Sequence, residues 1–300
     1  MISLKQIRYA LAVEKQLHFR KAAEYCTVSQ SALSTALSEM EKQLGFAVFE
    51  RDNKKVLVTP IGQQFLDKAK DIQVQVDDLM KLSQSHDAVL TYPMSVGIIP
   101  TICPYLLPRV LPSLNQQYPD FELNVVEEQS AVLVDMVRSG EIDTAILALP
   151  YPTDGLLTFE FWEEDLYWIS HGTPSSSANE VVTAKELENQ KLMLLKDGHC
   201  LKDQALSACG MGSDKAKSLS ATSLSTLIQL VIGNMGSTLI PAMALEHLVI
   251  NSTQLKTMRL AEPGPHRRIA FIVRPNYANV NNIETLMDLF KTQLETEVKA

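Results

Sequence analysis

Cysteine is scarce in this sequence, with four residues in a chain of 300. That number is too small for a structural disulfide framework, and it favours a reducing compartment in which the thiols stay free unless one is specially placed. Long apolar runs are absent as well, because the most apolar stretch, Val96 to Leu111, is broken by prolines and falls short of the roughly 18 residues that span a membrane. The first residues also lack the charged start and apolar run of a secretory signal. We therefore expect a soluble cytoplasmic protein without a membrane partner.

The familiar motifs of catalysis and cofactor binding are missing too. The chain has no glycine-rich phosphate loop, no His-Glu-x-x-His pattern and no nucleophile elbow, and its six histidines are scattered. The sequence therefore predicts no cofactor, no metal site and no enzyme.

Charge is distributed unevenly along the chain. The formal net charge is −8, which by itself argues against a nucleic-acid partner. Residues 1–70, however, hold eleven Lys and Arg against seven Asp and Glu, a balance of 11 − 7 = +4, so the remainder carries −8 − 4 = −12. A basic first segment joined to an acidic body predicts that only the first segment meets an acidic partner.

The basic segment begins with helical spacing of apolar residues. Two short helical patterns are followed by a turn at Cys26-Thr27-Val28 and by a third pattern from Leu33 to Leu44, which predicts a helix-turn-helix. Thr27 or Ser29 would cap the third helix. Its outer face carries short hydrogen-bonding side chains that fit the major groove of double-stranded DNA, namely Gln30, Ser31, Ser34 and Thr35. A merely solvated helix face would have the same composition.

The following segment favours DNA binding over a merely solvated helix face. Residues 49–60 alternate as strand, basic turn and strand, which predicts a wing whose Arg51, Lys54 and Lys55 contact phosphates or the minor groove. From Ile61 to Leu82, apolar residues then recur every three or four positions, which predicts a helix of about 33 Å. An apolar stripe of this length is long for a lone helix, so we expect it to pair with a second copy of the chain.

The acidic body alternates strand and helix patterns from Met94 to a closing helix at Glu284–Val298. This alternation predicts an α/β fold with mostly parallel sheets covered by helices.

One segment of the body has cysteines in an informative position. A strand should end at Asp197 and a helix begin near His199, so Cys200 lies in the first turn, where the helix dipole and the neighbouring His199 and Lys202 favour the thiolate. Cys209 follows nine residues later, and a continuous helix would separate the two Cα atoms by about 13.5 Å, against about 5.5 Å in a disulfide. A bonded pair would therefore require a second conformation. Two ordinary intracellular thiols are the alternative.

Three stretches resemble LysR-type transcriptional regulators: residues 19–24, residues 28–34 and residues 44–62. The resemblance implies a winged helix-turn-helix at residues 1–60 and a dimerising linker helix at residues 61–90. It further implies a two-lobed, periplasmic-binding-protein-like effector domain, with residues 91–163 and 269–300 in the first lobe and residues 164–268 in the second. Domains of this kind bind a small molecule between the lobes.

The stretch from Asp197 to Cys209 resembles the redox segment of the peroxide-sensing members of that family. The resemblance implies hydrogen peroxide as the signal, Cys200 as the peroxidatic cysteine and Cys209 as the resolving cysteine, joined in a reversible disulfide. It also implies a set of residues that bind peroxide or activate the thiol: Thr101, Ser130, His199, Asp203 and Arg267. The partners implied are RNA polymerase, a thiol reductant of the glutaredoxin or thioredoxin type, and further copies of the chain in a homodimer or homotetramer.

Two alternatives stay open at this point. The chain could be a regulator with an ordinary metabolite effector and incidental cysteines, or a thiol peroxidase that carries a DNA-binding domain. Cys103 lies two residues after Thr101 and could compete as a resolving thiol or simply pack in the core, and Cys26 lies at the turn between two helices, where packing is the expected role.

Overall fold

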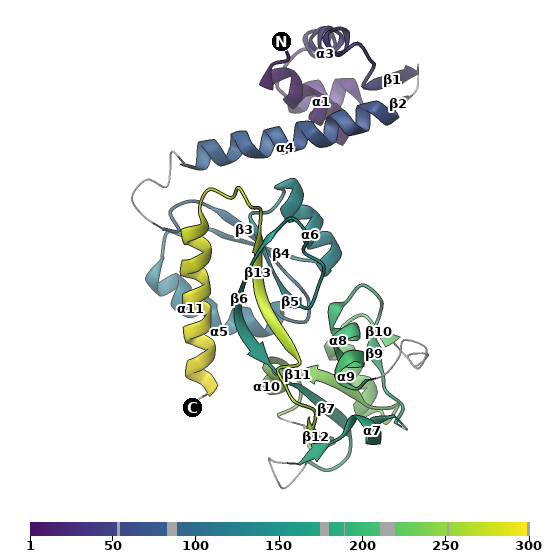
Figure 1. Cartoon of the computed structure of the whole chain (residues 1–300), viewed down its shortest axis with the longest axis vertical. Coiled ribbons are helices and arrows are strands. Elements are labelled where there is room, and N and C mark those ends of the chain that lie inside the picture. Colours follow the sequence, from purple (N-terminus) through teal and green to yellow (C-terminus); the bar gives the residue numbers. More distant parts are fainter. Residues whose placement is uncertain are drawn as a thin grey trace. The chain divides into compact units, whose positions relative to one another are not determined.

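The protein is described by a computed structural model that covers residues 1–52, 55–82, 89–174, 180–188, 190–210, 220–250 and 252–298. Two compact units make up the chain, residues 1–84 and residues 85–300 (Figure 1). Lys54 lies outside the described residues.

The N-terminal unit is a winged helix-turn-helix, as the spacing of its apolar residues predicted. Its elements are α1 (Leu4–Gln16), α2 (Phe19–Tyr25), α3 (Gln30–Leu44), β1 (Phe49–Asp52), β2 (Lys55–Val58) and α4 (Pro60–Leu82). Leu33, Leu37 and Met40 of α3 are fully buried in the core of this unit. The antiparallel pair of β1 and β2 forms the wing.

Ser29, and not Thr27, caps α3. The Ser29 hydroxyl accepts a hydrogen bond from the backbone N–H of Ala32 at 3.2 Å. Thr27 instead has a φ of 60° and forms the turn itself. The left-handed conformation at Thr27 lets the chain reverse between α2 and α3.

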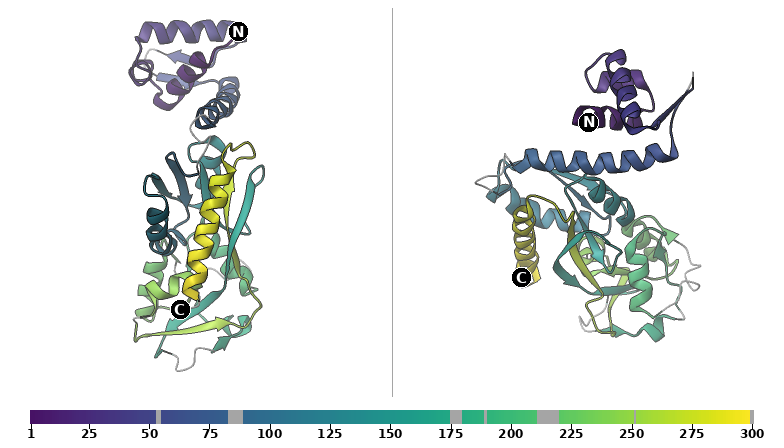
Figure 2. Two further views of the ribbon diagram at one scale, coloured as in Figure 1. Left: turned by 90° about the vertical axis from the view of Figure 1, so that its left-hand side faces the viewer. Right: turned by 45° about the horizontal axis from the view of Figure 1, so that its top comes forward.

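The second unit, residues 85–300, is called the effector unit below, and its first lobe is built on a five-stranded sheet. Its elements are β3 (Met94–Ile98), α5 (Cys103–Gln117), β4 (Leu123–Glu127), α6 (Ser130–Ser139), β5 (Thr144–Leu149), β6 (Leu157–Glu164), β13 (Arg267–Val273) and α11 (Val280–Val298). The strand order is β4-β3-β5-β13-β6. The crossovers through α5 and α6 run in opposite directions along the sheet, so the two helices cover opposite faces. Helix α11 packs on α5 and β6 and returns along the lobe (Figures 1 and 2).

The second lobe is built on a four-stranded sheet of order β11-β7-β12-β8 and a small parallel pair, β9 and β10. Its elements are β7 (Leu166–His171), β8 (Val181–Val182), α7 (Ala184–Leu187), β9 (Leu194–Leu195), α8 (Cys200–Ala208), β10 (Ser220–Ala221), α9 (Leu224–Ile232), β11 (Thr238–Pro241), η2 (Ala242–Ala244), α10 (Leu245–Leu248) and β12 (Leu255–Leu260). The chain passes between the two sheets after Glu164 and again before Arg267. Arg267 and Arg268 therefore lie on the sheet of the first lobe, although we expected them in the second.

Both larger sheets are mixed: most of their strands run in one direction, as expected, and each sheet contains one strand of the opposite direction. Strand β13 runs antiparallel to β5 and β6, and β7 runs antiparallel to β11 and β12. The cause is the second crossing, because a chain that returns from the second lobe enters the first sheet from the opposite end. The sequence patterns did not predict strands β6, β8, β10 and β12, and of these β6 and β12 are next to the crossings.

In the described ranges, none of the helices combines the length and the apolar character that a membrane span requires.

Candidate functional site

Cys200 is the first residue of α8, and the backbone before it is built tightly. Gly198 has a φ of 95°, and a Cβ atom at this position would lie 2.3 Å from Oε1 of Gln129. The left-handed backbone conformation favours glycine at this position, and a larger residue would also displace the end of the Gln129 side chain. His199 is the N-cap residue of α8, although its side chain makes no capping hydrogen bond.

The thiol of Cys200 faces the junction of the two lobes. Cys200 is buried, with an exposed fraction of 5%, and Ser130, the first residue of α6, is buried beside it. Within the described part of the chain, the Ser130 hydroxyl has no hydrogen-bond partner of ordinary geometry. It lies close enough to the Cys200 thiol to act on it as a hydrogen-bonding group, which lowers the pKa of that thiol.

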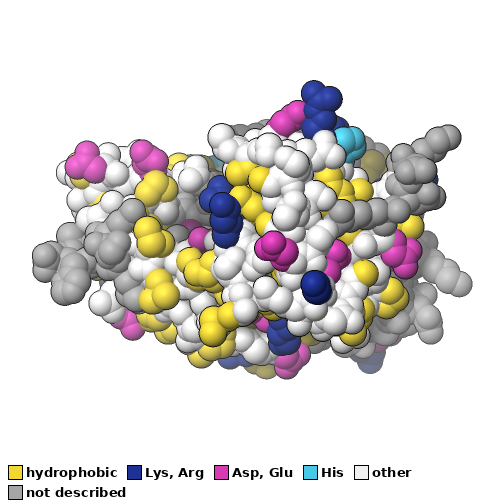
Figure 3. All heavy atoms as spheres, turned by 90° about the horizontal axis from the view of Figure 1, so that it is seen from above, with side chains coloured by type: hydrophobic (Ala, Val, Ile, Leu, Met, Phe, Trp, Pro, Cys, Tyr) yellow, Lys and Arg dark blue, Asp and Glu magenta, His cyan; other side chains and the backbone are white. Residues whose placement is uncertain are grey.

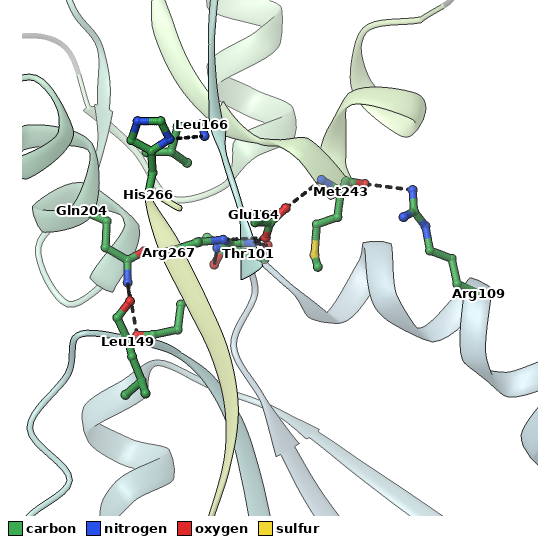
Figure 4. A network of polar contacts seen from close by, with 10 residues as sticks. Thr101, Arg109, Leu149, Glu164, Leu166, Gln204, Met243, His266 and Arg267 are labelled. Atoms are coloured by element: carbon green, nitrogen blue, oxygen red, sulfur yellow. Dashed lines mark hydrogen bonds and ion pairs between the residues drawn. The ribbon is translucent and has the colours of Figure 1, made fainter. Parts of the chain in front are cut away.

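Arg267 brings a positive charge to the same place and is held by a buried ion pair. Its Nε and Nη2 atoms lie 2.7 and 2.6 Å from Oε1 of Glu164. Nη1 donates to the Thr101 hydroxyl at 3.2 Å and Nη2 to the Thr101 carbonyl at 3.2 Å (Figure 4). The second oxygen of Glu164 accepts the backbone N–H of Met243 at 2.8 Å. This network joins the first lobe, through Thr101, to the second lobe, through Met243.

Strand register decides which basic residue reaches the site. Arg267 is buried, whereas Arg268 points to the opposite face and pairs with Glu160 at 3.0 Å with about half of its side chain exposed. His266 accepts the backbone N–H of Leu166 at Nδ1, 3.2 Å away (Figure 4). Of the three adjacent basic residues, only Arg267 joins Thr101 and the neighbourhood of Cys200.

The expectation that Cys200 rests as a thiolate is not met. Burial raises the pKa of the Cys200 thiol, and the opposing effects of Ser130, the positive charge of Arg267 and nearby backbone hydrogen bonds lower it by less. His199 contributes no cation, because burial lowers the pKa of its imidazole. Lys202 forms an ion pair with Asp197. In this conformation, burial therefore favours the protonated thiol.

Of the remaining predicted residues, His199 is buried next to this cluster and Asp203 is exposed. Nε2 of His199 is 3.5 Å from Nε2 of Gln129, at the entrance to α8. Asp203 is exposed and lines a cavity of about 510 Å³ on the Gln204 side of α8. The structure thus brings Ser130 and Arg267 to Cys200, joins Thr101 to Arg267, and leaves Asp203 at the surface of the helix.

All four cysteines are free and buried. Cys209 is the C-cap residue of α8, and burial together with the negative charge of Glu262 raises its pKa to about 11. Burial and a hydrogen bond to Glu127 raise the pKa of Cys103 to about 12, which makes it a poor nucleophile. Cys26 packs in the core of the N-terminal unit, as expected.

Two functional side chains were not predicted from the sequence. Glu164 pairs with Arg267, and Gln204 donates from Nε2 to the carbonyls of Ala148 and Leu149 at 3.1 and 3.3 Å (Figure 4). The three adjacent acidic residues Glu163, Glu164 and Asp165 could have indicated an ion pair with a buried arginine. The sequence does not show which of the three forms it.

The predicted DNA surface lies on α3 and the wing. Gln30, Ser31 and Thr35 are exposed and Ser34 is half-buried. Figure 3 shows the molecule from above, where uncharged polar side chains and backbone are interspersed with hydrophobic, basic and acidic side chains. Arg51 lies on β1, and Lys55 is exposed on β2. Among the described residues, no cluster of His, Cys, Asp and Glu is arranged to hold a metal ion.

A winged helix-turn-helix joined to a two-lobed α/β unit defines a DNA-binding transcription regulator with an effector domain. Residues 4–63 match the family described as bacterial regulatory helix-turn-helix protein, lysR family, and residues 89–295 match the LysR substrate binding domain. The chain belongs to the LysR family of transcription regulators.

Several relatives are similar over nearly the whole chain. The HTH-type transcriptional regulator EstR of Acinetobacter baylyi is 35% identical over 290 residues, which cover 96% of each chain. A probable hydrogen peroxide-inducible genes activator of Streptomyces viridosporus is 38% identical over 286 residues, covering 95% of this chain and 92% of that protein. Among solved structures, a full-length OxyR variant from Pseudomonas aeruginosa has a TM-score of 0.78 and 30% identity, with 97% of this chain and 98% of that chain covered.

The buried ion pair predicts unequal effects for two adjacent arginines. Arg267→Gln should lower the free energy of unfolding of the effector unit by about 3–5 kcal/mol, because Glu164 is left as an unpaired buried charge. Arg268→Gln breaks only an exposed pair and should cost about 0–1 kcal/mol. Urea unfolding followed by tryptophan fluorescence measures both, since both tryptophans lie in this unit. Equal losses would contradict the assignment of Arg267 as the buried partner.

The raised pKa of Cys200 predicts a pH profile for its alkylation. The rate should be low at neutral pH and still be rising as the pH passes 9.0, the ordinary value for the thiol. Ser130→Ala should shift the profile to still higher pH, because it removes a group that lowers the pKa. Mass spectrometry of the peptide that contains Cys200 gives the rate. A profile that is already flat at neutral pH would restore the thiolate expectation.

Proposed function

We propose that this regulator senses hydrogen peroxide through Cys200 and that a disulfide with Cys209 switches its action on promoter DNA. The observation that carries the proposal is the placement of Ser130 and of Arg267, which also binds Thr101, beside a buried cysteine at the start of a helix. The name of the Streptomyces relative and the likeness to OxyR structures support it.

Peroxide fits the chemistry of this place. It is a small, uncharged donor and acceptor of hydrogen bonds, and the buried Ser130 hydroxyl is a hydrogen-bonding group beside the Cys200 thiol. The Thr101 hydroxyl is a second hydrogen-bonding group on the Arg267 side. In the proposed complex, peroxide lies between these groups and the sulfur, and Arg267 stabilises the negative charge that develops as the thiol loses its proton.

The oxidation then proceeds in two balanced steps. Cys200 sulfur attacks one peroxide oxygen, the O–O bond breaks, and the thiol proton leaves with the second oxygen as water, which gives a sulfenic acid. The Cys209 thiol next attacks the Cys200 sulfur, an S–S bond forms, and the sulfenic hydroxyl leaves as water with the Cys209 proton. A dithiol reductant of the glutaredoxin or thioredoxin type returns the disulfide to two thiols.

The helix between the cysteines has to change shape for the second step. Helix α8 is continuous from Cys200 to Ala208 with Cys209 as its C-cap, so the two Cα atoms are separated by about 13.5 Å, against about 5.5 Å in a disulfide. Leu201, Ala205 and Leu206 are buried along this helix. Each buried leucine contributes roughly 1.5–3 kcal/mol, so unwinding α8 would also loosen its neighbours.

The same proposal includes a dimer on DNA. The outer part of α4 exposes Ile72, Leu79 and Met80, with Met80 at 66% exposure, and an apolar surface of this kind favours pairing with a second copy. We infer that Gln30, Ser31, Ser34 and Thr35 read the major groove, while Arg51, Lys54 and Lys55 contact the backbone. Contact with RNA polymerase and assembly to a tetramer complete the proposed role.

A metabolite-responsive regulator is the second candidate, because EstR, at 35% identity, does not carry a peroxide name. A thiol peroxidase is the third. Steady-state peroxide consumption with thioredoxin as reductant separates the peroxidase from both regulators, since a sensor needs only one cycle for each signal.

Substitutions on the N-terminal unit should separate base reading from backbone contact. Lys55→Ala should weaken binding to all DNA sequences alike and reduce the dependence of log affinity on log salt by about 1. Gln30→Ala should instead relax specificity at one base pair, at a cost of about 1–3 kcal/mol for the preferred sequence. Fluorescence anisotropy with specific and scrambled duplexes at several salt concentrations makes the measurement. Unchanged binding in both variants would remove this surface from the proposal.

Substitutions of the cysteines should separate sensing from switching. Cys200→Ser should abolish the change in DNA binding after a peroxide pulse, and Cys209→Ser should leave a sulfenic acid on Cys200 without a stable switch. Cys103→Ser serves as the control and should respond like the parent. Hydrogen exchange should show residues 200–209 losing protection on oxidation. Unchanged protection despite a confirmed Cys200–Cys209 bond would contradict the unwinding of α8.

A further inference from the structure

A polar cavity lies on the second lobe and shares no lining residue with the surroundings of Cys200. Its volume is about 430 Å³. The side chains that matter for its chemistry are Trp168, Ser170, His171, Lys191, Asn234 and Ser237. They come from β7, from the segment that leads to β9, and from the turn between α9 and β11.

The sheet register places three of these side chains on one face. Trp168 and Ser170 are two residues apart on β7 and therefore point to the same side. Thr238 of β11 pairs with Ile169, so Ser237, one residue earlier, lies opposite Ser170. Trp168, Ser170 and Ser237 thus form one wall of the cavity.

Backbone contacts hold Lys191 against this wall. The N–H of Ser237 donates to the carbonyl of Lys191 at 2.9 Å, and the N–H of Met193 donates to the carbonyl of Ser237 at 2.7 Å. A Cβ atom at Gly236 would lie 2.4 Å from the Lys191 carbonyl oxygen. The close approach requires glycine at this position and keeps the base of the lysine side chain beside Ser237.

Two buried polar atoms at the cavity are unsatisfied. Ser237 has an exposed fraction of 3%, and its hydroxyl has no hydrogen-bond partner among the residues that the structure describes. The indole Nε1–H of Trp168 is buried and, across the same residues, also meets no acceptor. An indole N–H can only donate, so its missing partner has to be an acceptor. Buried groups left without partners cost free energy, which an incoming acceptor would recover.

The charge around the cavity has one sign. Lys191 is a cation, His171 offers a further donor, and no Asp or Glu is among the described residues that line the cavity. Hydrogen-bond donors with a lysine and without a carboxylate match an anion that carries several acceptor oxygens.

We propose that this cavity is a second ligand site of the regulator and binds the oxyanion group, carboxylate or phosphate, of a small metabolite. The Trp168 indole and the Ser237 hydroxyl donate to its oxygens, and Lys191 balances its charge. The segment from Lys191 runs through β9 directly to the start of α8, the helix that begins with Cys200. The proposal is independent of peroxide sensing, because it involves neither cysteine.

Intrinsic fluorescence tests the site directly. The chain has two tryptophans, so Trp162→Phe leaves Trp168 as the only reporter. The full chain with this substitution is titrated with inorganic phosphate and, separately, with citrate, each against potassium chloride at equal ionic strength. A saturable change in Trp168 emission with phosphate alone identifies a phosphate site, and one with citrate alone or with both identifies a carboxylate or general oxyanion site. A response no different from that of chloride for both anions overturns the proposal.

Two variants and one control locate the binding. Lys191→Ala and Ser237→Ala, each in the Trp162→Phe background, should weaken the saturable binding by about tenfold or more, since each removes a hydrogen bond to a charged group. Lys185→Ala, an exposed residue of α7 outside the cavity, should leave the affinity unchanged. Ser237→Ala should unfold at the same temperature as its parent, because its hydroxyl has no partner among the described residues. Parental affinity in both cavity variants would also overturn the proposal.

Discussion

The buried ion pair of Arg267 and Glu164 is the contact on which the arrangement of the effector unit depends. The side chains are 0% and 2% exposed, so neither charge is compensated by bulk water. Such a pair is tolerated only when the remaining polar atoms are also satisfied. Thr101 accepts two hydrogen bonds from Arg267, and Met243 donates its backbone N–H to Glu164. Because Glu164 and Arg267 lie at the two crossings between lobes, the pair sets both the junction of the lobes and the charge beside Cys200.

That charge acts on a thiol that burial keeps protonated. Burial raises the pKa of Cys200 and Arg267 lowers it, with burial the larger effect. A thiol in this balance has little thiolate at neutral pH, so it is protected from general oxidants that need an exposed thiolate. When a ligand against the sulfur takes its proton, the positive charge of Arg267 stabilises the thiolate that remains. In the proposed function, selectivity for peroxide therefore comes from the shape and polarity of the site and not from a reactive resting thiolate.

Periodicity in the sequence was enough to predict several helices and strands, but not which strands pair or which side chains meet. The apolar spacing of α3 and α4 and the strand at Thr144–Leu149 follow from local pattern, because each buries one face or a whole strand. The antiparallel direction of β13 does not follow from local pattern, because it depends on the path of the chain through the second lobe between Glu164 and Arg267. Likewise, nothing local says that Gln204 is buried while Asp203 beside it is exposed. One residue is a rotation of about 100° on a helix, and packing against Ala148 and Leu149 decides the phase.

Gln204 also explains how a change in α8 would be felt outside the second lobe. The helix belongs to the second lobe, but the Gln204 amide donates to two carbonyls at the end of β5 in the first lobe. Cys200 and Cys209 lie at the two ends of this helix, and Gln204 lies between them. Any conformation that brings the two sulfur atoms together has to break the helical hydrogen bonds around Gln204, and the amide then loses its position over β5. The Gln204 hydrogen bonds between the lobes and the distance between the cysteines therefore both depend on helix α8. A change of the helix that brings the cysteines together also breaks the contact between the lobes.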